Sequence, residues 1–560
     1  MTEKIVKSLR DSKTARWTAL ILASLSIFGA YYFNYALSSI KPMLESILGW
    51  NSEDFGTYTS AYAWFNVFLF MLIFSGFILD KLGIRKTGLG ATLVMFIGTA
   101  LNYWAVSHEF AAGSSVYIPL LGEMKMQVLL SSLGFALFGV GTEAIGITIS
   151  KAVVRWFKGK ELALAMGMQM SIARLGTLLA LAISLPLAKN FTVTAPILFA
   201  LAVMLIGIVS FILFSILDVK LDKSEKDIEV DTSDEFKIKD IMLIITNRGF
   251  WYIAILCVLF YSAVFPFLFY ATDLMINKYN VSPYLAGLIP SLLPLGTLFL
   301  TPLFGSVYDK YGKGATIMII GSLILIFVHG VLAIPGLTTW WIAAVMVIIL
   351  GVGFSLVPSA MWPSVPKIIP EKQLGTAYAV IFWIQNIGLL FIPLILGFVL
   401  NATNPDVSPN KILVRSAIEK AFKEMLPEDS FTDIEIGMAL DKTTGATVDS
   451  IVQYTEYIPV AIEEVDTENV RNEIYMSIAT GISNIDVTGD KEETLEKIIL
   501  IGRNNAYTII QKEKLNITYD YFYDMLIFLG LSIVSLFFAF MLRVEDRKKG
   551  YGLEQPNIQK

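Results

Sequence analysis

Long apolar runs separated by short polar loops dominate this chain. A helix that crosses a bilayer needs about 20 mostly apolar residues, and runs of that length predict twelve membrane spans. The first run follows a polar, basic start and continues for about 24 residues, longer than the apolar core of a signal peptide, so we interpret it as the first span. The predicted spans are residues 17–40, 56–79, 87–107, 128–151, 162–188, 195–217, 249–274, 282–307, 314–335, 338–362, 373–400 and 523–542.

Two polar stretches interrupt this all-α membrane pattern. Residues 218–248 are charged and poor in apolar side chains, and their place near the midpoint predicts a cytoplasmic linker between two halves. Residues 401–521 separate spans eleven and twelve. Within them, 411–426 and 491–511 have helical apolar spacing, whereas 450–465 alternates as a strand does. Because a segment of this length can bury a core of its own, we predict a small folded α+β domain outside the membrane.

Composition and charge agree with this pattern. Hydrophobic residues make up 55% of the chain and charged residues only 16%, which excludes an ordinary soluble protein. Lysine and arginine gather in the loops on the side of the amino terminus, so the positive-inside rule places both termini in the cytoplasm. The net charge of −5 hides an asymmetry, because the stretch between spans eleven and twelve carries 11 basic and 22 acidic residues. The predicted parts are an amino-terminal six-helix half 1–217, the linker 218–248, spans seven to eleven in 249–400, the acidic outer insert 401–521, span twelve in 522–542 and a cytoplasmic tail 543–560.

Several chemistries are excluded by what the sequence lacks. The single Cys257 rules out an internal disulfide framework, and two scattered histidines, His108 and His329, are too few for a histidine metal site. No phosphate-binding G-x-x-x-x-G-K-[ST] loop occurs, which argues against a nucleotide-driven pump. We therefore expect no enzyme and no cofactor. The expected partners are a small-molecule substrate and the lipid bilayer, without nucleic acid, and the chain is expected to act as a monomer.

The two halves repeat each other in sequence. Residues 138–146 align with 350–358, and 160–176 align with 372–388, both at an offset of 212 positions. Self-similarity between six-span halves is typical of transporters that bind substrate between their repeats, near the middle of the membrane. Two charged residues break the symmetry, and we interpret them as functional because the repeated scaffold does not require them. Glu143 falls opposite Ser355, and Arg174 falls opposite Asn386.

Glu143 and Arg174 are the main candidates for binding substrate. Each lies within an apolar span, where an isolated charge is unfavourable by at least ~2.5–3.5 kcal/mol, so each should face a protein interior or a watery cavity. Arginine supplies a planar fork of donors that suits a carboxylate, and glutamate accepts from an ammonium group. Together they suit a zwitterion. The alternative is a structural ion pair between spans four and five, because a buried pair can be retained without adding net stability.

Further candidates for a central cavity are aromatic and amide side chains on spans two, ten and eleven. Helical spacing puts Tyr62 and Asn66 on one face of span two. Core packing is the alternative role for each aromatic residue, whereas amides within a span need hydrogen-bond partners. Asp273 and Asp524 lie near outer helix ends, where we expect solvated positions. The cavity candidates are Tyr62, Trp64, Asn66, Trp362, Gln385 and Asn386.

A glycine- and charge-rich motif follows span two. The segment G-x-x-x-D-K-x-G-x-R-K at 76–86, with a weaker copy at 305–314, resembles the signature of the major facilitator superfamily. The resemblance implies a twelve-span fold of two six-helix halves. It also implies a cytoplasmic latch that holds the outward-open state, in which Asp80 meets the start of span eleven at 370–373. An ordinary basic inner loop is the alternative. The latch candidates are Gly76, Asp80, Lys81, Gly83, Arg85, Lys86, Arg155, Asp309 and Lys310.

Three longer segments narrow the resemblance. Residues 139–176, 361–380 and 383–393 resemble the major facilitator superfamily domain-containing protein 1 group, whose characterised animal member is a lysosomal dipeptide uniporter with a lumenal accessory glycoprotein. The resemblance implies alternating-access transport of dipeptides or small peptides. Glu143 and Arg174 would hold the charged ends of the substrate, and the aromatic residues of spans two and ten would line the cavity. The sequence departs from the pattern at Phe65, where proline is expected, and beside Glu143 at Thr142 and Ala144.

Two alternatives stay open for the function. One is a proton-coupled symporter of another small organic anion or amino acid, in which Glu143 titrates as substrate binds. The other is a membrane receptor whose acidic outer domain binds a partner. The insert 401–521 is not part of the family pattern, and we hypothesise that it replaces an accessory subunit or binds an outer partner. Because the amino-terminal tail has no acidic dileucine sorting signal, we favour a bacterial inner membrane.

Overall fold

The computed structural model describes residues 9–111, 113–118, 122–157, 160–224, 242, 244–370, 373–427, 429–454, 466–487 and 489–556. Most of the predicted linker 218–248 lies outside these residues. Its first seven residues are helical, because α8 continues to Ser224 rather than ending at 217. The helix is longer than its apolar run because Asp218 and Asp222 on it form ion pairs with basic residues of neighbouring helices.

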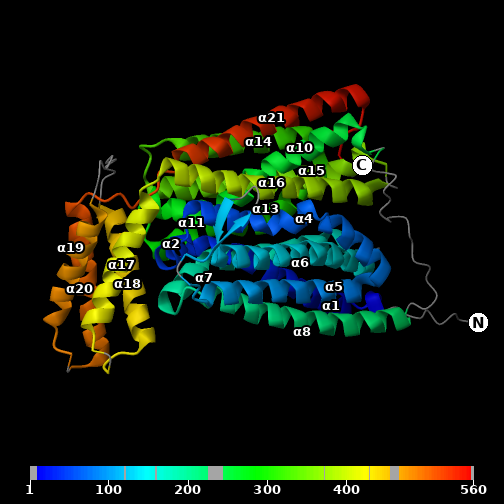
Figure 1. The fold of residues 1–560 in the computed structure, drawn as a ribbon. Coiled ribbons are helices and arrows are strands. Elements are labelled where there is room, and N and C mark those ends of the chain that lie inside the picture. The colour runs from blue at the N-terminus through cyan, green and yellow to red at the C-terminus, as the bar shows by residue number, and fades with distance from the viewer. Residues whose placement is uncertain are drawn as a thin grey trace, which may run out of the picture.

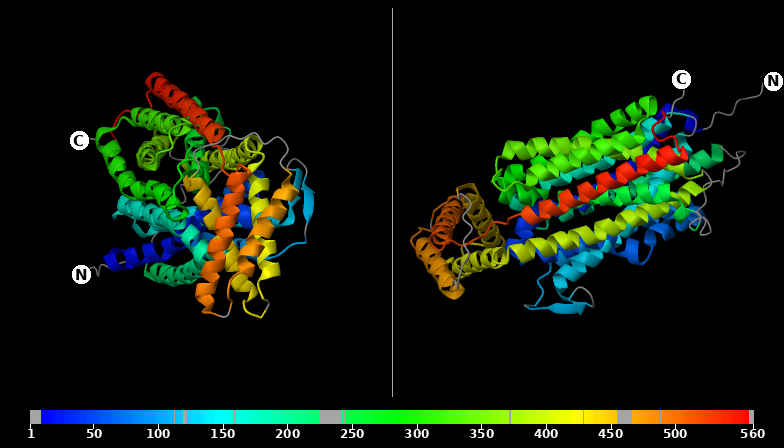
Figure 2. Two further views of the ribbon diagram at one scale, coloured as in Figure 1. Left: turned by 90° about the vertical axis from the view of Figure 1, so that its left-hand side faces the viewer. Right: turned by 90° about the horizontal axis from the view of Figure 1, so that it is seen from above.

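The membrane part is a bundle of long helices that lie side by side (Figures 1 and 2). Eleven helices among the described residues are long and apolar enough to cross a membrane. The helices of the amino-terminal half are α1 (Lys13–Ala36), α2 (Lys41–Leu48), α3 (Ser52–Ser60), α4 (Trp64–Phe68), α5 (Met71–Ser107), α6 (Met126–Phe157), α7 (Leu162–Asn190) and α8 (Ala195–Ser224), with short 3-10 helices η1 (Leu9–Asp11), η2 (Ser38–Ile40) and η3 (Ala61–Ala63). Those of the other half are α10 (Arg248–Ser262), α11 (Phe265–Asn277), α12 (Pro283–Ala286), α13 (Leu288–Tyr311), α14 (Gly314–Ala333), α15 (Trp340–Ile368), α16 (Leu374–Thr403) and α21 (Phe522–Lys549).

The predicted second span, 56–79, is not one continuous helix. It consists of α3, η3, α4 and the beginning of α5, with a break at Phe70, whose φ of 53° is unusual for a bulky residue. Helix α5 is itself two helices joined at Gly83, where φ is 74° and ψ is 172°. Only glycine adopts such a conformation without strain, so the chain turns there from one helix into the next. These breaks explain why length and composition single out eleven helices.

The insert forms a separate helical bundle across one end of the membrane helices (Figure 1). Its helices are α17 (Val407–Met425), α18 (Asp433–Tyr454), α19 (Thr467–Ser483) and α20 (Lys491–Lys512), and they enclose a second hydrophobic core around Ile418, Phe422 and Ile474. The predicted α+β character is therefore wrong for the described part of the insert. Residues 450–454 of the expected strand continue α18, and 455–465 lie outside the described residues.

The reason for this error lies in the composition of α18. Leu440, Thr443, Thr444 and Thr447 are buried at helical spacing, so its buried stripe consists largely of threonines rather than large aliphatic residues. A short antiparallel hairpin that the apolar pattern did not predict, β1 (Ser115–Ile118) with β2 (Gly122–Lys125), joins α5 to α6.

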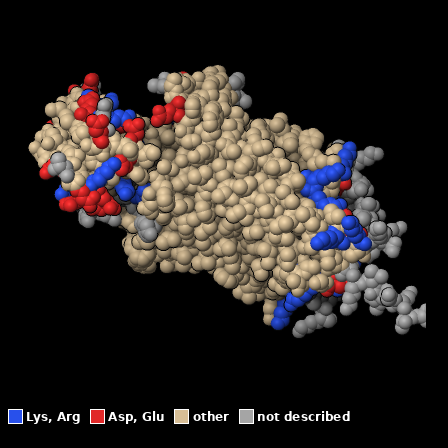
Figure 3. Space-filling view, turned by 90° about the horizontal axis from the view of Figure 1, so that it is seen from below, with Lys and Arg blue, Asp and Glu red and all other residues tan. Residues whose placement is uncertain are grey.

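Charge is distributed unevenly between the two ends of the molecule. The first and last described parts of the chain, η1 and the residues after α21, lie at the end opposite the insert, which we call the end with the termini (Figure 1). On the face shown in Figure 3, Lys and Arg gather at the end with the termini, Asp and Glu gather mainly on the insert, and the band between them carries almost no charge. Such a band is what contact with lipid requires.

The two halves are in close contact at the insert end. A Cβ atom on Gly56 of α3 would lie 2.6 Å from the carbonyl oxygen of Pro393 and 2.8 Å from the Cα atom of Gly397 on α16. A Cβ atom on Gly287, just before α13, would lie 2.0 Å from the carbonyl oxygen of Leu181 on α7. Both contacts join opposite halves. The described structure is therefore closed at the end that carries the insert.

Candidate functional site

Glu143 lies in the middle of α6, where it faces both halves of the bundle. Its Oε1 atom accepts a hydrogen bond of 3.0 Å from the hydroxyl of Tyr62. That tyrosine belongs to η3, and α6 can approach it closely because Gly139 has no side chain; a Cβ there would lie 2.1 Å from the Tyr62 carbonyl oxygen. The side-chain amide of Asn386 on α16 lies close to the Glu143 carboxylate, and its Nδ2 atom donates to the Phe382 carbonyl oxygen at 3.0 Å. Residues from both halves therefore surround the carboxylate.

Arg174 on α7 likewise faces both halves. Its guanidinium carbon lies 5.6 Å from the ring centre of Tyr31 on α1, 5.7 Å from that of Phe265 on α11 and 5.0 Å from that of Phe354 on α15. Aromatic faces at these distances attract a cation without using its N–H donors. We call Arg174 and these three rings the arginine cage.

The two opposite charges do not pair with each other. No ion pair within 4.0 Å and no hydrogen bond joins Glu143 to Arg174, both of which are among the described residues. Both side chains are half-buried rather than sealed in the core. The alternative of a structural ion pair between spans four and five thus does not describe this state. The arrangement offers an acceptor and a fork of donors to a ligand between the halves.

Trp362 extends the aromatic lining on the carboxy-terminal half. Its indole N–H donates to the Tyr261 hydroxyl at 3.0 Å, and its ring stacks on Phe382 with ring centres 4.8 Å apart. The Tyr261 ring contacts both Phe265 and Phe354 of the arginine cage. This candidate therefore connects to the arginine cage through one intervening tyrosine.

The remaining cavity candidates make contacts away from the two charges. Gln385 is buried between α16 and α10, where its amide oxygen is 3.6 Å from the Cys257 sulfur. The buried Asn66 donates to the Tyr62 carbonyl oxygen at 3.4 Å, and the Trp64 indole N–H donates to the Ser60 hydroxyl at 3.0 Å. These contacts describe local packing in this state.

Four residues at the site were missed by reasoning from the sequence: Tyr31, Tyr261, Phe265 and Phe354. The chain contains 37 Phe and 23 Tyr, so an aromatic residue within a span is no signal by itself. Phe354 had the one usable signal, since it precedes the position that the repeat aligns with Glu143.

The latch candidates near the termini form a charged cluster within the amino-terminal half. Asp80 pairs with Lys151 of α6 at 2.6 Å, and Arg85 pairs with Asp222 at 2.7 Å. Arg155 contacts the buried Asp218 at 3.1 Å. Lys151, Asp218 and Asp222 were not among the predicted residues.

The other latch candidates contribute less in this state. Lys81 and Lys310 lie over the aromatic rings of Phe77 and Tyr311, and a Cβ on Gly76 would meet nothing within 4 Å. Among the described residues, Asp80 has no bond to the start of α16. Glu371 and Lys372, part of its predicted partner, lie outside them.

Two helical halves around a polar site in a lipid-facing bundle define a membrane transporter. The chain belongs to the Major Facilitator Superfamily, whose family model matches residues 23–393. It is a multi-pass membrane transporter and not an enzyme, and the sequence-based resemblance is confirmed.

Named relatives narrow the comparison. The lysosomal dipeptide transporter MFSD1 of Danio rerio is 28% identical over 69% of this chain and 81% of its own length. MFSD1 of Homo sapiens is 27% identical over 69% and 80%. These relatives belong to the group that the sequence motifs predicted.

Solved structures show the same fold. A bacterial homolog to the human lysosomal transporter Spinster, in an inward-facing and occupied conformation, has a TM-score of 0.55 at 12% identity and covers 96% of this chain and 98% of its own. The nucleoside transporter NupG has a TM-score of 0.53 at 11% identity, with 79% and 100% covered. At these identities the likeness concerns the fold alone.

Proposed function

We propose that this chain moves dipeptides and other small peptides across its membrane by alternating access, as a uniporter. The observation that carries the proposal is the pair of unjoined opposite charges between the halves, Glu143 and Arg174, each in contact with residues of both halves. A dipeptide at neutral pH has one ammonium group and one carboxylate group. The names of the MFSD1 relatives, at 27–28% identity, support the same substrate class.

Each end of the substrate would meet a prepared group. The peptide carboxylate would bind the guanidinium of Arg174, which the three rings of its cage hold in place without competing for its N–H groups. The peptide ammonium would donate to Glu143, which is oriented by Tyr62 and lies close to Asn386. Since the main-chain ends carry the recognition, many side chains could be accepted beside Trp362.

The proposal includes a topology. The broken segment from Ser52 to 82 is the second of twelve spans. The two halves are 1–224 and 249–400 with span twelve in 522–542. The linker joins the halves, and the tail 543–560 follows. Both termini are cytoplasmic, because Lys and Arg gather at their end, and the insert 401–521 is outside. The charged cluster around Asp80 is the cytoplasmic gate, with Asp309 and Lys310 in the second copy of the motif.

We propose further that the chain acts as a monomer and that its insert takes the place of an accessory subunit. The bacterial inner membrane stays a prediction, since the relatives are named as lysosomal. Imaging of the full chain fused to a fluorescent protein in its own cells would locate the membrane directly.

Uptake by proteoliposomes tests the substrate and the two binding groups. Wild-type protein should exchange a labelled dipeptide saturably and should discriminate against the same dipeptide with an acetylated amine. Arg174→Ala should abolish this uptake. Glu143→Gln should lose the discrimination against the acetylated peptide, because the carboxylate that pairs with the ammonium is gone. Arg415→Met, a charge removed from the insert, is the control for expression and folding. Undiminished dipeptide uptake by Arg174→Ala would contradict the site assignment.

A second candidate is proton-coupled symport of another small organic anion or amino acid. One observation favours it: no cation lies within 4.0 Å of the Glu143 carboxylate among the described residues, so no ion pair opposes its protonation. The two functions differ in energetics. A symporter accumulates substrate when a pH gradient is imposed and stops when a protonophore is added, whereas a uniporter only equilibrates it.

A further inference from the structure

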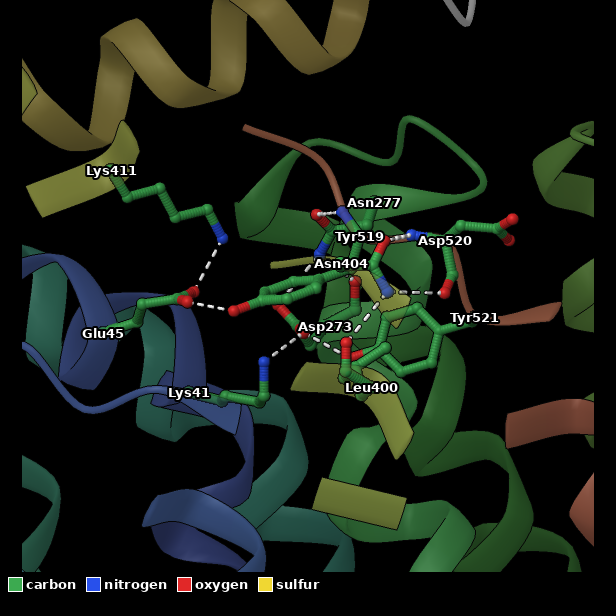
Figure 4. Close-up of polar contacts among 10 residues, drawn as sticks. All are labelled: Lys41, Glu45, Asp273, Asn277, Leu400, Asn404, Lys411, Tyr519, Asp520 and Tyr521. Atoms are coloured by element: carbon green, nitrogen blue, oxygen red, sulfur yellow. Dashed lines mark hydrogen bonds and ion pairs between the residues drawn. The ribbon is translucent and has the colours of Figure 1, made fainter. Parts of the chain in front are cut away.

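A buried network of charges closes the end of the bundle next to the insert (Figure 4). Lys41 and Glu45 lie four residues apart on α2, so they share one face of that helix. The Lys41 ammonium donates to Asp273 Oδ2 at 2.7 Å, and the Lys411 ammonium donates to Glu45 Oε2 at 2.7 Å. None of these four side chains is more than 2% exposed. The expectation that Asp273 is solvated was therefore wrong.

The two ion pairs come from three different parts of the chain. Helix α2 belongs to the amino-terminal half and presents one cation and one anion. Asp273 on α11 belongs to the carboxy-terminal half, whereas Lys411 lies in α17, the first helix of the insert. The transporter scaffold thus supplies the partner of Lys41, and the insert supplies the partner of Glu45. The charges of the set balance, as burial requires.

The segment that leaves the insert completes the network. The Tyr519 hydroxyl donates to Glu45 Oε1, and the Tyr521 hydroxyl donates to Asp273 Oδ2. The Tyr519 ring lies between the two ammonium groups, 4.3 Å from that of Lys41 and 4.6 Å from that of Lys411. A ring in this position attracts both cations and keeps them apart.

The insert is fixed to the carboxy-terminal half. Its ends continue directly from α16 and into α21. The two ends of the insert are joined to each other, because the backbone N–H of Asp520 donates to Asn404 Oδ1 at 2.8 Å and the Asn404 amide donates back to the Asp520 carbonyl at 3.1 Å. The backbone N–H of Tyr519 also donates to Asn277 Oδ1 at 2.9 Å. The insert must therefore move with this half, and its two bonds to Glu45 cross between the halves.

We propose that the insert is a working part of the outer gate, with Lys411 and Tyr519 as gate residues that hold the amino-terminal half through Glu45. The inference rests on the alternating-access function proposed above and goes beyond a covering role. For the outer side to open, the halves must separate at α2. Opening then breaks the bonds from Lys411 and Tyr519 to Glu45 together with the direct Lys41–Asp273 pair.

A single-cysteine reporter tests this inference. Ser39 in η2 is fully buried between the halves, where its hydroxyl lies 3.3 Å from the Leu181 carbonyl oxygen and 3.5 Å from the Thr272 hydroxyl. With the native cysteine replaced by Cys257→Ala, a Ser39→Cys thiol can react with a membrane-impermeant maleimide added on the insert side only when the outer gate opens. Thr272→Cys, on the facing helix, serves as a second reporter.

Two gate variants and one matched control are then compared. Lys411→Met should raise the labelling rate by about tenfold, and Tyr519→Phe should raise it several-fold, because each loses a hydrogen bond to a buried carboxylate. The control is Arg415→Met, one turn along α17, which breaks a 2.5 Å pair with Asp441 inside the insert and should leave labelling unchanged. If Lys411→Met does not fold, Tyr519→Phe carries the test, since it removes only one hydroxyl.

The outcomes separate the two proposals. Labelling needs no substrate, so it reports on the gate whatever the cargo is. Equal labelling of both gate variants and the parent would overturn the gate role of the insert, and so would an equal increase with Arg415→Met. Failure of wild-type protein to exchange dipeptides would instead overturn the proposed substrate and leave the labelling result standing.

Discussion

The contact between Gly56 and Gly397 makes a quantitative prediction about which way the transporter opens. A Cβ atom on Gly56 would lie 2.6 Å from the Pro393 carbonyl oxygen and 2.8 Å from the Gly397 Cα atom. Since non-bonded carbons pack at about 3.5–4.0 Å, Gly56→Ala forces α3 and α16 apart by roughly 1 Å. Overpacking of this kind typically destabilises by about 1–3 kcal/mol. The penalty falls only on the outer-closed state, where the two helices touch.

The expected result is a shift of the population toward the outward-open state. A penalty of that size corresponds to a change of about 5- to 150-fold in the equilibrium between the two states. The Ser39→Cys reporter should therefore be labelled faster in Gly56→Ala than in the parent. Dipeptide exchange should slow, because the transporter returns less often from the outward-open to the outer-closed state.

A matched substitution controls for changes in the segment itself. Gly76 belongs to the same broken span, but a Cβ there would meet nothing within 4 Å. Gly76→Ala should not raise labelling from the outer side. Unchanged labelling in Gly56→Ala, with the unfolding temperature preserved, would refute the idea that this crossing holds the outer side closed.

Two further predictions concern the arginine cage and the outer surface. Phe354→Leu removes the ring nearest to Arg174 and should raise the KM for a dipeptide about threefold, measured by counterflow, whereas Phe260→Leu in the same aromatic cluster should not. Lys278 lies just beyond its span and donates to the Leu332 and Ile334 carbonyls, and burial lowers its pKa from 10.5 to about 8. Between these pH values the unfolded state binds more protons than the folded state, so the unfolding temperature of the wild type should rise with pH relative to that of Lys278→Met. If the unfolding temperatures of the two proteins change in parallel with pH, this effect is excluded.

The membrane helices could be predicted because lipid imposes a simple rule on sequence. Every span must be apolar over its length, and this rule located the predicted spans. It did not reveal where a span is broken, and span two is the clearest case. Its composition is continuous through Tyr62 and Phe70, so nothing in the apolar count reveals that the helix changes to a 3-10 turn at the first and that φ becomes positive at the second. The break has a use, since the carbonyl freed at Val67 accepts from the Trp383 indole at 3.2 Å.

The two central charges could be predicted for a related reason, and their surroundings could not. Glu143 and Arg174 are conspicuous in apolar runs, and the repeat showed that the scaffold does not require them. The arginine cage consists of common residue types, and its members become recognisable only when three distant helices meet. The outer network of ion pairs could not be predicted from the sequence at all, because Lys41 and Asp273 are 232 residues apart and Glu45 and Lys411 are 366 apart.

The two ends of the transporter differ in what holds them. At the end with the termini, Asp80 and Lys151 are 29% and 49% exposed, and exposed pairs contribute only about 0–1 kcal/mol. The Asp80–Lys151, Arg85–Asp222 and Arg155–Asp218 pairs of that cluster also lie within one half, so they do not resist separation of the halves.

At the insert end the balance is different, because the ion pairs cross between halves and are almost completely buried. Removing one partner of such a pair is unfavourable by about 3–5 kcal/mol, since the other charge stays buried without compensation. Opening the outer side must therefore hydrate all four charges together, whereas opening the other side leaves the Asp80–Lys151, Arg85–Asp222 and Arg155–Asp218 pairs intact. The empty carrier should rest closed at the insert and open toward the termini, and by adding Lys411 and Tyr519 the insert strengthens that preference.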